Sequence, residues 1–183
     1  MHRLRFELEA TATGSSAHGM LPGIDKQALI AALHARLAAR HEALVASQRS
    51  AQAGATHGES KQEHAKDMRA VEQQYLARGL AERAETLRDA VAVLASLEAR
   101  DFDADEPVHA GALVGLVDED DRELVYLLAP AGGGETVDAG GTTVTVVTPQ
   151  SPLGASLLGA HVGDELGIEI GAKRRAVTVE WLR

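Results

Sequence analysis

Two glutamates, Glu59 and Glu63, lie four residues apart beside the one break in a long run of helix-forming sequence. Carboxylate oxygens are the ligands that hard cations such as Mg²⁺ prefer, so such a pair could supply part of a coordination sphere. Each glutamate also ends a capping-box pattern that begins at Thr56 or at Ser60. In that pattern the Glu side chain accepts a hydrogen bond from a free backbone amide at a helix start. From spacing alone, helix capping is the favoured interpretation.

Other polar side chains near this break give weaker signals. Asp67 would extend an acidic stripe from Glu63, but basic residues interleave, so we interpret this face as solvated. We interpret His57 and His64 as polar turn residues rather than ligands. Three arginines of the preceding segment could contact nucleic acid or a protein wall, and we interpret them as ordinary solvated charges: Arg36, Arg40 and Arg49.

These side chains must be positioned by a helical hairpin that covers residues 25–100. Apolar residues at helical spacing form a first seam, which Arg40 interrupts, and a second seam on the return: Ile30, Leu33, Leu37 and Leu44, then Leu76, Leu80, Ala84, Leu87, Val91 and Leu94. We expect the two seams to cover each other. A helix of about 30 residues rises about 45 Å, so the turn should project as a tip.

The predicted ends of the two helices follow from capping and breaking residues. Asp25 is placed to cap the first helix, which should run to about Gln52, and the second should run from just after Gly58 to about Ala99. Gly79 lies inside the second helix and costs up to about 1 kcal/mol relative to Ala, which packing against the first helix must offset.

After an acidic connector, residues 101–107, the apolar period changes from about 3.6 to 2. Two strands are predicted from alternating apolar residues: Ala112, Val114 and Leu116, then Leu124, Tyr126 and Leu128. The charged turn between them, Asp118–Asp121, is interpreted as a solvated hairpin turn rather than a metal site. Gly132–Gly134 should be a flexible turn, and further strands are expected at Thr142–Thr148 and Val177–Trp181.

One short helix is predicted between the last two strands. Ser151 is placed to cap it, Pro152 occupies a position where a missing N–H costs nothing, and Gly159 can end it. Its apolar side consists of Leu153, Leu157 and Leu158. The expected fold is therefore α+β, with an N-terminal helical hairpin followed by a small antiparallel sheet wrapped on one helix.

Composition limits the remaining possibilities. Aromatic residues make up 3% of the 183, too few for one large core, so we predict four units: an extension at 1–23 that is not native before Met20, the hairpin at 24–100, a linker at 101–107 and a C-terminal domain at 108–183. The chain has no cysteine and no long apolar run, so we expect a cytoplasmic, monomeric protein without membrane contact or a zinc site. The net charge is -9, and residues 101–183 contain 15 acidic and 5 basic residues. Duplex DNA is an unexpected partner, because its phosphates are bound by clustered Lys and Arg.

Residues 148–166 read Thr-Pro-Gln-Ser-Pro-Leu-Gly-Ala-Ser-Leu-Leu-Gly-Ala-His-Val-Gly-Asp-Glu-Leu. This segment resembles the Ser-Pro-Leu-Gly, Leu-Leu-Gly, Val-Gly-Asp-Glu signature of the Gre family of bacterial transcript cleavage factors, whose C-terminal domain is FKBP-like. Residues 57–62, His-Gly-Glu-Ser-Lys-Gln, resemble that family's hairpin tip, and residues 72–76, Glu-Gln-Gln-Tyr-Leu, resemble a following anchor. The resemblance covers about residues 25–183.

The resemblance implies a transcription elongation factor that binds RNA polymerase and has no enzymatic activity or cofactor of its own. The hairpin would enter the polymerase's secondary channel, and the C-terminal domain would dock at its mouth through Ser151, Pro152, Leu153, Gly154, Leu157 and Leu158. Glu59 and Glu63 would then help to hold a Mg²⁺ shared with the polymerase beside the 3′ end of a backtracked nascent RNA, where two metals promote phosphodiester hydrolysis.

The sequence departs from the family pattern at the tip. Aligning residues 57–62 puts Glu59 at the first acidic position and neutral Gln62 at the second, whereas aligning residues 72–74 puts Glu63 at the second and Ser60 at the first. Three hypotheses follow: a cleavage stimulator, a channel-binding regulator without cleavage, and an FKBP-like prolyl isomerase or holdase. The third is disfavoured because active isomerases of that fold line a pocket with aromatic residues, and the C-terminal unit has only Phe102, Tyr126 and Trp181.

Overall fold

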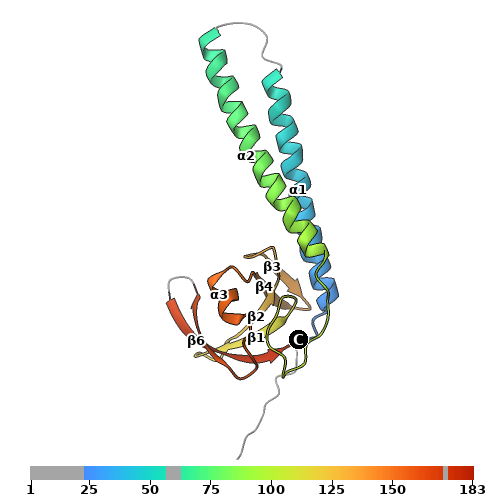
Figure 1. Ribbon diagram of the computed structural model, residues 1–183, viewed down its shortest axis with the longest axis vertical. Coiled ribbons are helices and arrows are strands. Elements are labelled where there is room, and N and C mark those ends of the chain that lie inside the picture. The colour runs from blue at the N-terminus through green and yellow to red at the C-terminus, as the bar shows by residue number, and fades with distance from the viewer. Residues whose placement is uncertain (1–22, 57–62, 171–172) are drawn as a thin grey trace, which may run out of the picture.

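A long helical hairpin rises from one side of a six-stranded sheet in the computed structural model, which describes residues 23–56, 63–170 and 173–183 (Figure 1). Helix α1 spans Lys26–Thr56 and α2 spans Glu63–Ala95. At about 1.5 Å per residue, 31 and 33 residues give lengths of about 46 and 50 Å. The predicted hairpin is therefore confirmed. None of the helices in the described ranges combines the length and hydrophobicity needed to cross a bilayer.

The helix ends differ from the predicted ones by a turn of helix. The Oδ1 atom of Asp25 accepts a hydrogen bond from the Ala28 amide at 3.0 Å, so this cap is confirmed. Helix α1 continues past Gln52 to Thr56, and α2 stops at Ala95. Because Thr56 is the last residue of α1, the capping box that was predicted to begin there does not start a helix.

The C-terminal part is a sheet of order β3-β4-β2-β1-β6-β5 with one short helix, α3 (Pro152–Leu157). Its strands in chain order are β1 (Leu113–Asp118), β2 (Glu123–Leu128), β3 (Thr136–Ala139), β4 (Thr142–Val147), β5 (Glu165–Ile170) and β6 (Lys173–Leu182). The predicted strands correspond to β1, β2, β4 and β6, whereas β3 and β5 were not predicted.

The sheet is mixed, so the prediction of an antiparallel sheet is wrong at one pair. Strands β2 and β4 are parallel, with Val125 opposite Val144 and Leu128 opposite Val147, while every other pair is antiparallel. The short strand β3 is the cause. It forms a hairpin with β4 at the outer edge of the sheet, and the chain therefore returns beside β2 in the same direction as β2.

Both faces of this sheet are buried: α3 packs on one face and the base of the hairpin packs on the other. The residues predicted from alternation, such as Val114 and Tyr126, lie on the face that α3 covers. The residues between them, such as Leu113 and Leu127, pack beneath the base of the hairpin together with Leu33. The hairpin and the sheet therefore share a hydrophobic core. The two seams cover each other at the base, as expected, and Leu33 and its neighbours on α1 also pack on the sheet, which was not predicted.

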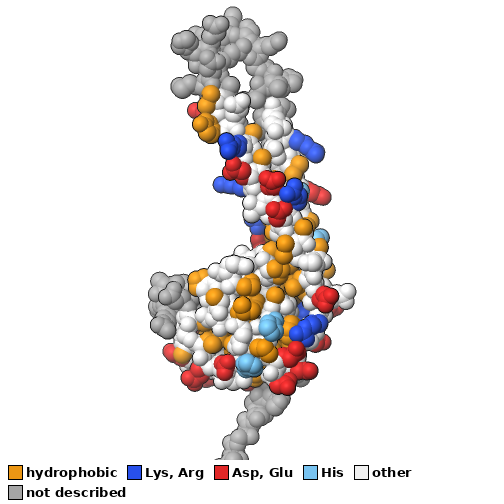
Figure 2. Space-filling view, viewed as in Figure 1, with side chains coloured by type: hydrophobic (Ala, Val, Ile, Leu, Met, Phe, Trp, Pro, Cys, Tyr) orange, Lys and Arg blue, Asp and Glu red, His pale blue; other side chains and the backbone are white. Residues whose placement is uncertain are grey.

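Further from the sheet, the two helices cover each other incompletely. Leu76, a predicted seam residue, is 57% exposed and Tyr75 is 74% exposed, while Leu44 and Leu87 are half-buried. Figure 2 shows hydrophobic side chains on the surface of the hairpin as well as around its base. The outer part of the predicted seam on α2 is consequently an open apolar surface.

Ion pairs explain why Arg40 interrupts the apolar seam of α1. Glu135, in the loop before β3, accepts a hydrogen bond from Arg40 and forms an ion pair with Arg36 at 3.7 Å. Arg36 Nη1 also donates to the Thr136 carbonyl oxygen at 2.5 Å. In the same loop Gly132 packs on Leu33, with φ +84. The interpretation of both arginines as ordinary solvated charges was therefore incomplete, because they join α1 to the sheet. Arg49 has no ion-pair partner among the described residues.

Candidate functional site

The short helix α3 and the loop before it form the best-defined part of the candidate docking site. Ser151 has extended backbone angles, φ -75 and ψ 151, and its Oγ accepts a hydrogen bond from the Gly154 amide at 3.1 Å. The same hydroxyl donates to the Thr148 carbonyl oxygen at 2.8 Å. Pro152 follows at the first helical position. The predicted cap is confirmed, and one serine hydroxyl closes both the loop and the helix start.

After α3, the chain is held by backbone hydrogen bonds to Val108, the residue that follows the connector. Gly159 has φ +83 and its amide donates to the Val108 carbonyl oxygen at 2.8 Å. The Val108 amide in turn donates to the Ala160 carbonyl oxygen at 2.8 Å. Gly159 ends the helix as predicted, because a positive φ suits glycine. The segment 151–160 is thereby fixed at both ends.

The six predicted docking residues divide into two groups. Ser151, Gly154 and Leu157 face inward, and Leu157 is fully buried in the core between α3 and the sheet. Leu153 is half-buried and packs against the same core, so it belongs with them. Pro152 is exposed and Leu158 is 46% exposed. The expectation that Leu158 belongs to the buried side of α3 is wrong, because the helix ends at Leu157 and the chain has already turned outward. Pro152 and Leu158 are the residues that a partner could contact.

The side chains of the predicted metal ligands at the hairpin tip lie outside the part of the chain that the structure describes. Glu59 and Gln62 lie outside the described residues, and Glu63 is the first residue of α2, with a side chain that also lies outside them. Their metal and catalytic roles, and the capping box from Ser60 to Glu63, remain predictions. No group of three or more His, Cys, Asp or Glu side chains that could hold a metal occurs in the described part of the chain.

The charged turn between β1 and β2 is an ordered ion-pair network. The side chain of Asp118 is 3% exposed and accepts hydrogen bonds from the backbone amides of Asp120 and Arg122, both at 3.0 Å. The Arg122 side chain, Nε at 3.0 Å, and Arg175, Nη1 at 3.3 Å, bind its other oxygen. The interpretation of this turn as solvated is therefore wrong for Asp118, whose charge is compensated by two arginines.

The ionisation of Asp118 follows from the balance of these contacts. Burial alone would raise the pKa of Asp118, but the hydrogen bonds from Arg122 and from the Asp120 amide outweigh it and hold the pKa below its ordinary value. Because all acceptor positions of Asp118 are directed at protein donors, this carboxylate stabilises the turn and joins it to β6.

The three aromatic residues of the C-terminal part do not line a common pocket. Phe102 and Tyr126 belong to the core on the α3 side of the sheet, whereas Trp181 packs on the opposite face, over Gly115. Each is at most 8% exposed. This arrangement disfavours the isomerase hypothesis, which requires aromatic side chains that converge on a peptide.

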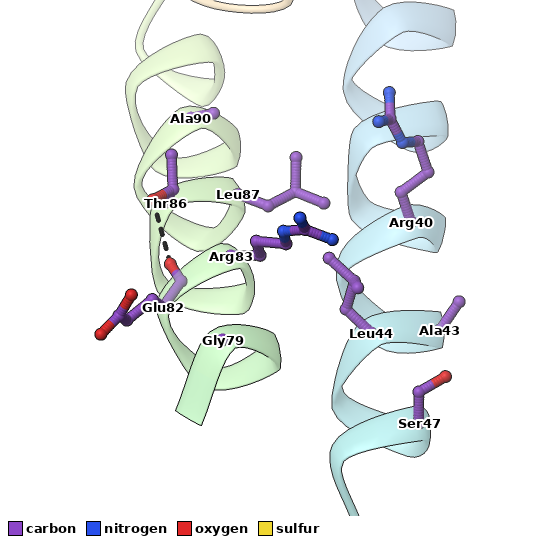
Figure 3. Close-up of a pocket in the computed structure, with 10 residues that line it drawn as sticks. All are labelled: Arg40, Ala43, Leu44, Ser47, Gly79, Glu82, Arg83, Thr86, Leu87 and Ala90. Atoms are coloured by element: carbon purple, nitrogen blue, oxygen red, sulfur yellow. Dashed lines mark hydrogen bonds between the residues drawn. The ribbon is translucent and has the colours of Figure 1, made fainter. Parts of the chain in front are cut away.

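A groove of about 1000 Å³ lies between α1 and α2 beyond the sheet (Figure 3). Sequence reasoning did not predict it. Small residues such as Ala43 and Gly79 face the gap from the two helices, and Leu44 and Leu87 provide its apolar floor. No atom would lie within 4 Å of a Cβ at residue 79. A glycine inside a helix is unusual, and Gly79 was therefore the signal in the sequence that could have indicated this gap.

Solved structures of the transcription factor Gfh1 and of a prokaryotic transcription elongation factor GreA/GreB are among those to which this chain is similar. They include Gfh1, a GreA factor homologue of Thermus thermophilus, at 19% identity and TM-score 0.37, with 82% of this chain and 94% of that chain covered. Gfh1 of Thermus aquaticus follows at 15% identity and TM-score 0.35, covering 80% and 91%. A GreA/GreB elongation factor from Nitrosomonas europaea has 23% identity and TM-score 0.33, covering 60% and 88%.

No family model matches the sequence, and no curated protein matches it. At these identities and TM-scores, the similarity to solved structures carries no argument by itself. The functional proposal is therefore argued from the residues of this chain.

Proposed function

We propose that this chain is an accessory factor of RNA polymerase that inserts its hairpin into the secondary channel and stimulates cleavage of backtracked RNA. The observation that carries the proposal is the structure of residues 148–160. The segment that resembles the Gre signature forms one ordered unit, in which the Ser151 hydroxyl closes the loop and Leu158 remains exposed. A sequence match that arose by chance would not be expected to fall on a complete capped helix.

The hairpin supports the same proposal through its length and connection. It extends about 46 to 50 Å and its base is buried against the sheet. Because α3 and the base of the hairpin pack on opposite faces of the same sheet, a contact at α3 would be linked to the distant tip through that sheet. In this division of roles, the sheet domain docks and the hairpin carries two carboxylates to the active site of the polymerase.

The donor set at the tip fits a shared Mg²⁺. Glu59 and Glu63 provide oxygen donors, which Mg²⁺ prefers, and two carboxylates can fill only part of its six positions. Such an ion, held jointly with the polymerase, would supply an activated water and stabilise the leaving oxygen. Glu59 and Glu63 would hold the ion near the RNA 3′ end, and the polymerase would remain the enzyme.

A second function, occupation of the channel without cleavage, is favoured by one residue. Gln62 is neutral, and in the register that places Glu59 at the first acidic position it stands where the second carboxylate is expected. An amide oxygen is a weaker ligand for a hard cation than a carboxylate. Such a protein would compete with active cleavage factors for the polymerase.

The proposal is tested with a stalled, backtracked bacterial RNA polymerase complex that carries 3′-labelled RNA. We expect the full chain to accelerate release of a short 3′ fragment in the presence of Mg²⁺. The double variant Glu59→Ala, Glu63→Ala should lose this stimulation and retain binding, because α3 and the hairpin flanks are unchanged. Glu42→Ala, an exposed acid on α1, is the matched control. A wild-type chain that neither cleaves nor competes with a cleavage factor would contradict both functions.

A further inference from the structure

The groove between α1 and α2 continues as an uncovered apolar strip toward the tip. Tyr75 and Leu76 precede Gly79 by four and three residues, so they lie on the same face of α2, one turn further on. They are 74% and 57% exposed, and Val71, one turn beyond Tyr75, is 49% exposed. Half-buried Leu87 extends the face in the other direction. From Tyr75 to Ala90 this surface is about 23 Å long, which is four turns of helix.

Along the groove itself, two of the residues that α1 presents to α2 are small. Ala43 and Ser47 line the groove on α1, and Leu44 is the only large apolar side chain that α1 contributes to the lining. The result is a pair of antiparallel helices with a shallow channel between them. Helices with such a channel accept the apolar face of a third helix.

The charges at the mouth of the groove are not balanced. Arg40 is paired with Glu135, and Glu82 is paired with Arg78 at 3.2 Å. Arg83 has no ion-pair partner among the described residues, and its side chain extends from α2 into the space between the helices, toward Leu44 (Figure 3). An uncompensated guanidinium above an apolar floor suits a partner with a carboxylate beside its apolar side chains.

We propose that this groove binds an acidic amphipathic α-helix of the polymerase, about four turns long, with one carboxylate opposite Arg83. This inference rests on the proposed function and adds a contact of the hairpin flank to that of α3. Apolar side chains of the polymerase helix pack on Leu44, Leu87 and the strip at Tyr75. The hairpin is then held along its length rather than only at its base.

The test is a polymerase binding titration with two matched pairs of full-length variants. Ala43→Trp fills the groove, whereas Ala46→Trp places the same side chain on an exposed position of α1 outside it. Arg83→Glu reverses the unpaired charge, and Arg49→Glu reverses an exposed arginine that does not line the groove. We expect the first member of each pair to weaken binding about tenfold or more, and the second to change it less than about twofold. Circular dichroism checks that all four variants fold. If Ala43→Trp does not fold, the binding of Arg83→Glu, which changes only a surface charge, tests the proposal.

A cross-link identifies the occupant. The chain has no cysteine, so Ser47→Cys provides a single thiol in the groove for a photoreactive label. Irradiation in the polymerase complex should give a cross-link to a helix of a polymerase subunit. A cross-link to RNA or to a second copy of this chain overturns the proposal. If the wild type does not bind polymerase, the proposed function fails as well, whereas unchanged binding by Ala43→Trp and Arg83→Glu overturns only the helix in the groove.

Discussion

Gly154 lies so close to Thr148 that a Cβ atom at residue 154 would be 2.0 Å from the carbonyl oxygen of Thr148 and 2.6 Å from its carbonyl carbon. Because these two atoms belong to the backbone of Thr148, they cannot move aside as the end of a flexible side chain could. We expect Gly154→Ala to open the loop and to lower the free energy of unfolding by about 1 to 3 kcal/mol or more. Urea titration followed by circular dichroism measures the change, and an unaffected midpoint would contradict this close approach.

Gly79 should show the opposite behaviour. It lies inside α2 and no atom is within 4 Å of the position of its Cβ. Alanine fits there without a clash and has less conformational freedom in the unfolded chain, so Gly79→Ala should stabilise the protein by about 0.5 to 1 kcal/mol. A rise in the urea midpoint is the expected result. A fall would show that α1 approaches α2 more closely here than the groove implies.

Alternating apolar residues predicted β1 and β2, whereas β3 and β5 were missed for different reasons. Every second residue of β1 and β2 faces α3: Val114 and Leu116 in β1, and Leu124, Tyr126 and Leu128 in β2. Strand β3 has only four residues, including exposed Asp138, which is too short for a sustained period of 2. Strand β5 does alternate, with Leu166, Ile168 and Ile170 separated by Glu165, Gly167 and Glu169, so its signal was present in the sequence and was overlooked. The direction of pairing was also invisible, because side-chain alternation is identical in parallel and antiparallel strands. The parallel pair of β2 and β4 could therefore not be foreseen.

Side chains that act over long sequence separations were the other source of error. Arg40 interrupts an apolar seam and was interpreted as solvated, yet its partner Glu135 lies 95 residues away. Asp118 was assigned to the surface because charges are usually exposed, and it is buried because Arg122 and Arg175 compensate it. By contrast, the cap at Ser151 was predictable, because all of its partners lie within three residues.

Leu157 and Leu158 are adjacent and should separate stability from binding. Leu157 is 0% exposed, so Leu157→Ala should cost about 2 to 5 kcal/mol of stability. Leu158 is 46% exposed, so Leu158→Ala should cost less than about 1 kcal/mol. If α3 is the docking site, Leu158→Ala should nevertheless weaken polymerase binding. Equal polymerase affinity of Leu158→Ala and the wild type would place the docking contact elsewhere.

Lys26 gives the protein a stability term that depends on pH. Lys26 is 4% exposed. Its Nζ donates a hydrogen bond to the Arg100 carbonyl oxygen at 2.5 Å and lies 4.9 Å from the centroid of the Phe102 ring. Burial lowers the pKa of Lys26 to about 8 from 10.5, an effect that Asp101 opposes and that Arg183 reinforces. Between pH 8 and 10.5 the unfolded chain therefore binds more protons at this residue than the folded chain.

Because the unfolded state binds the extra proton, this term makes the folded state more stable as pH rises through that window. Relative to a Lys26→Met variant, the wild type should gain about 1 to 2 kcal/mol between pH 8 and 10.5, after allowance for screening by solvent. Urea titrations of both proteins at several pH values measure the difference, in which the other titrating groups cancel. Parallel curves for the two proteins would contradict a lowered pKa of Lys26.

Gln62→Glu distinguishes the two channel-binding functions. It restores a second carboxylate at the tip in the register that begins with Glu59, and it leaves both capping-box glutamates, Glu59 and Glu63, unchanged. If Glu59 binds Mg²⁺, the variant should raise the rate of RNA cleavage, and the gain should disappear when Glu59 is also replaced by Ala. If Glu59 and Glu63 only cap a helix, their loss should cost about 0.5 to 2 kcal/mol of local stability and reduce activity in part. A wild-type chain and a Gln62→Glu variant that both compete for polymerase without cleaving RNA would establish the regulator function instead.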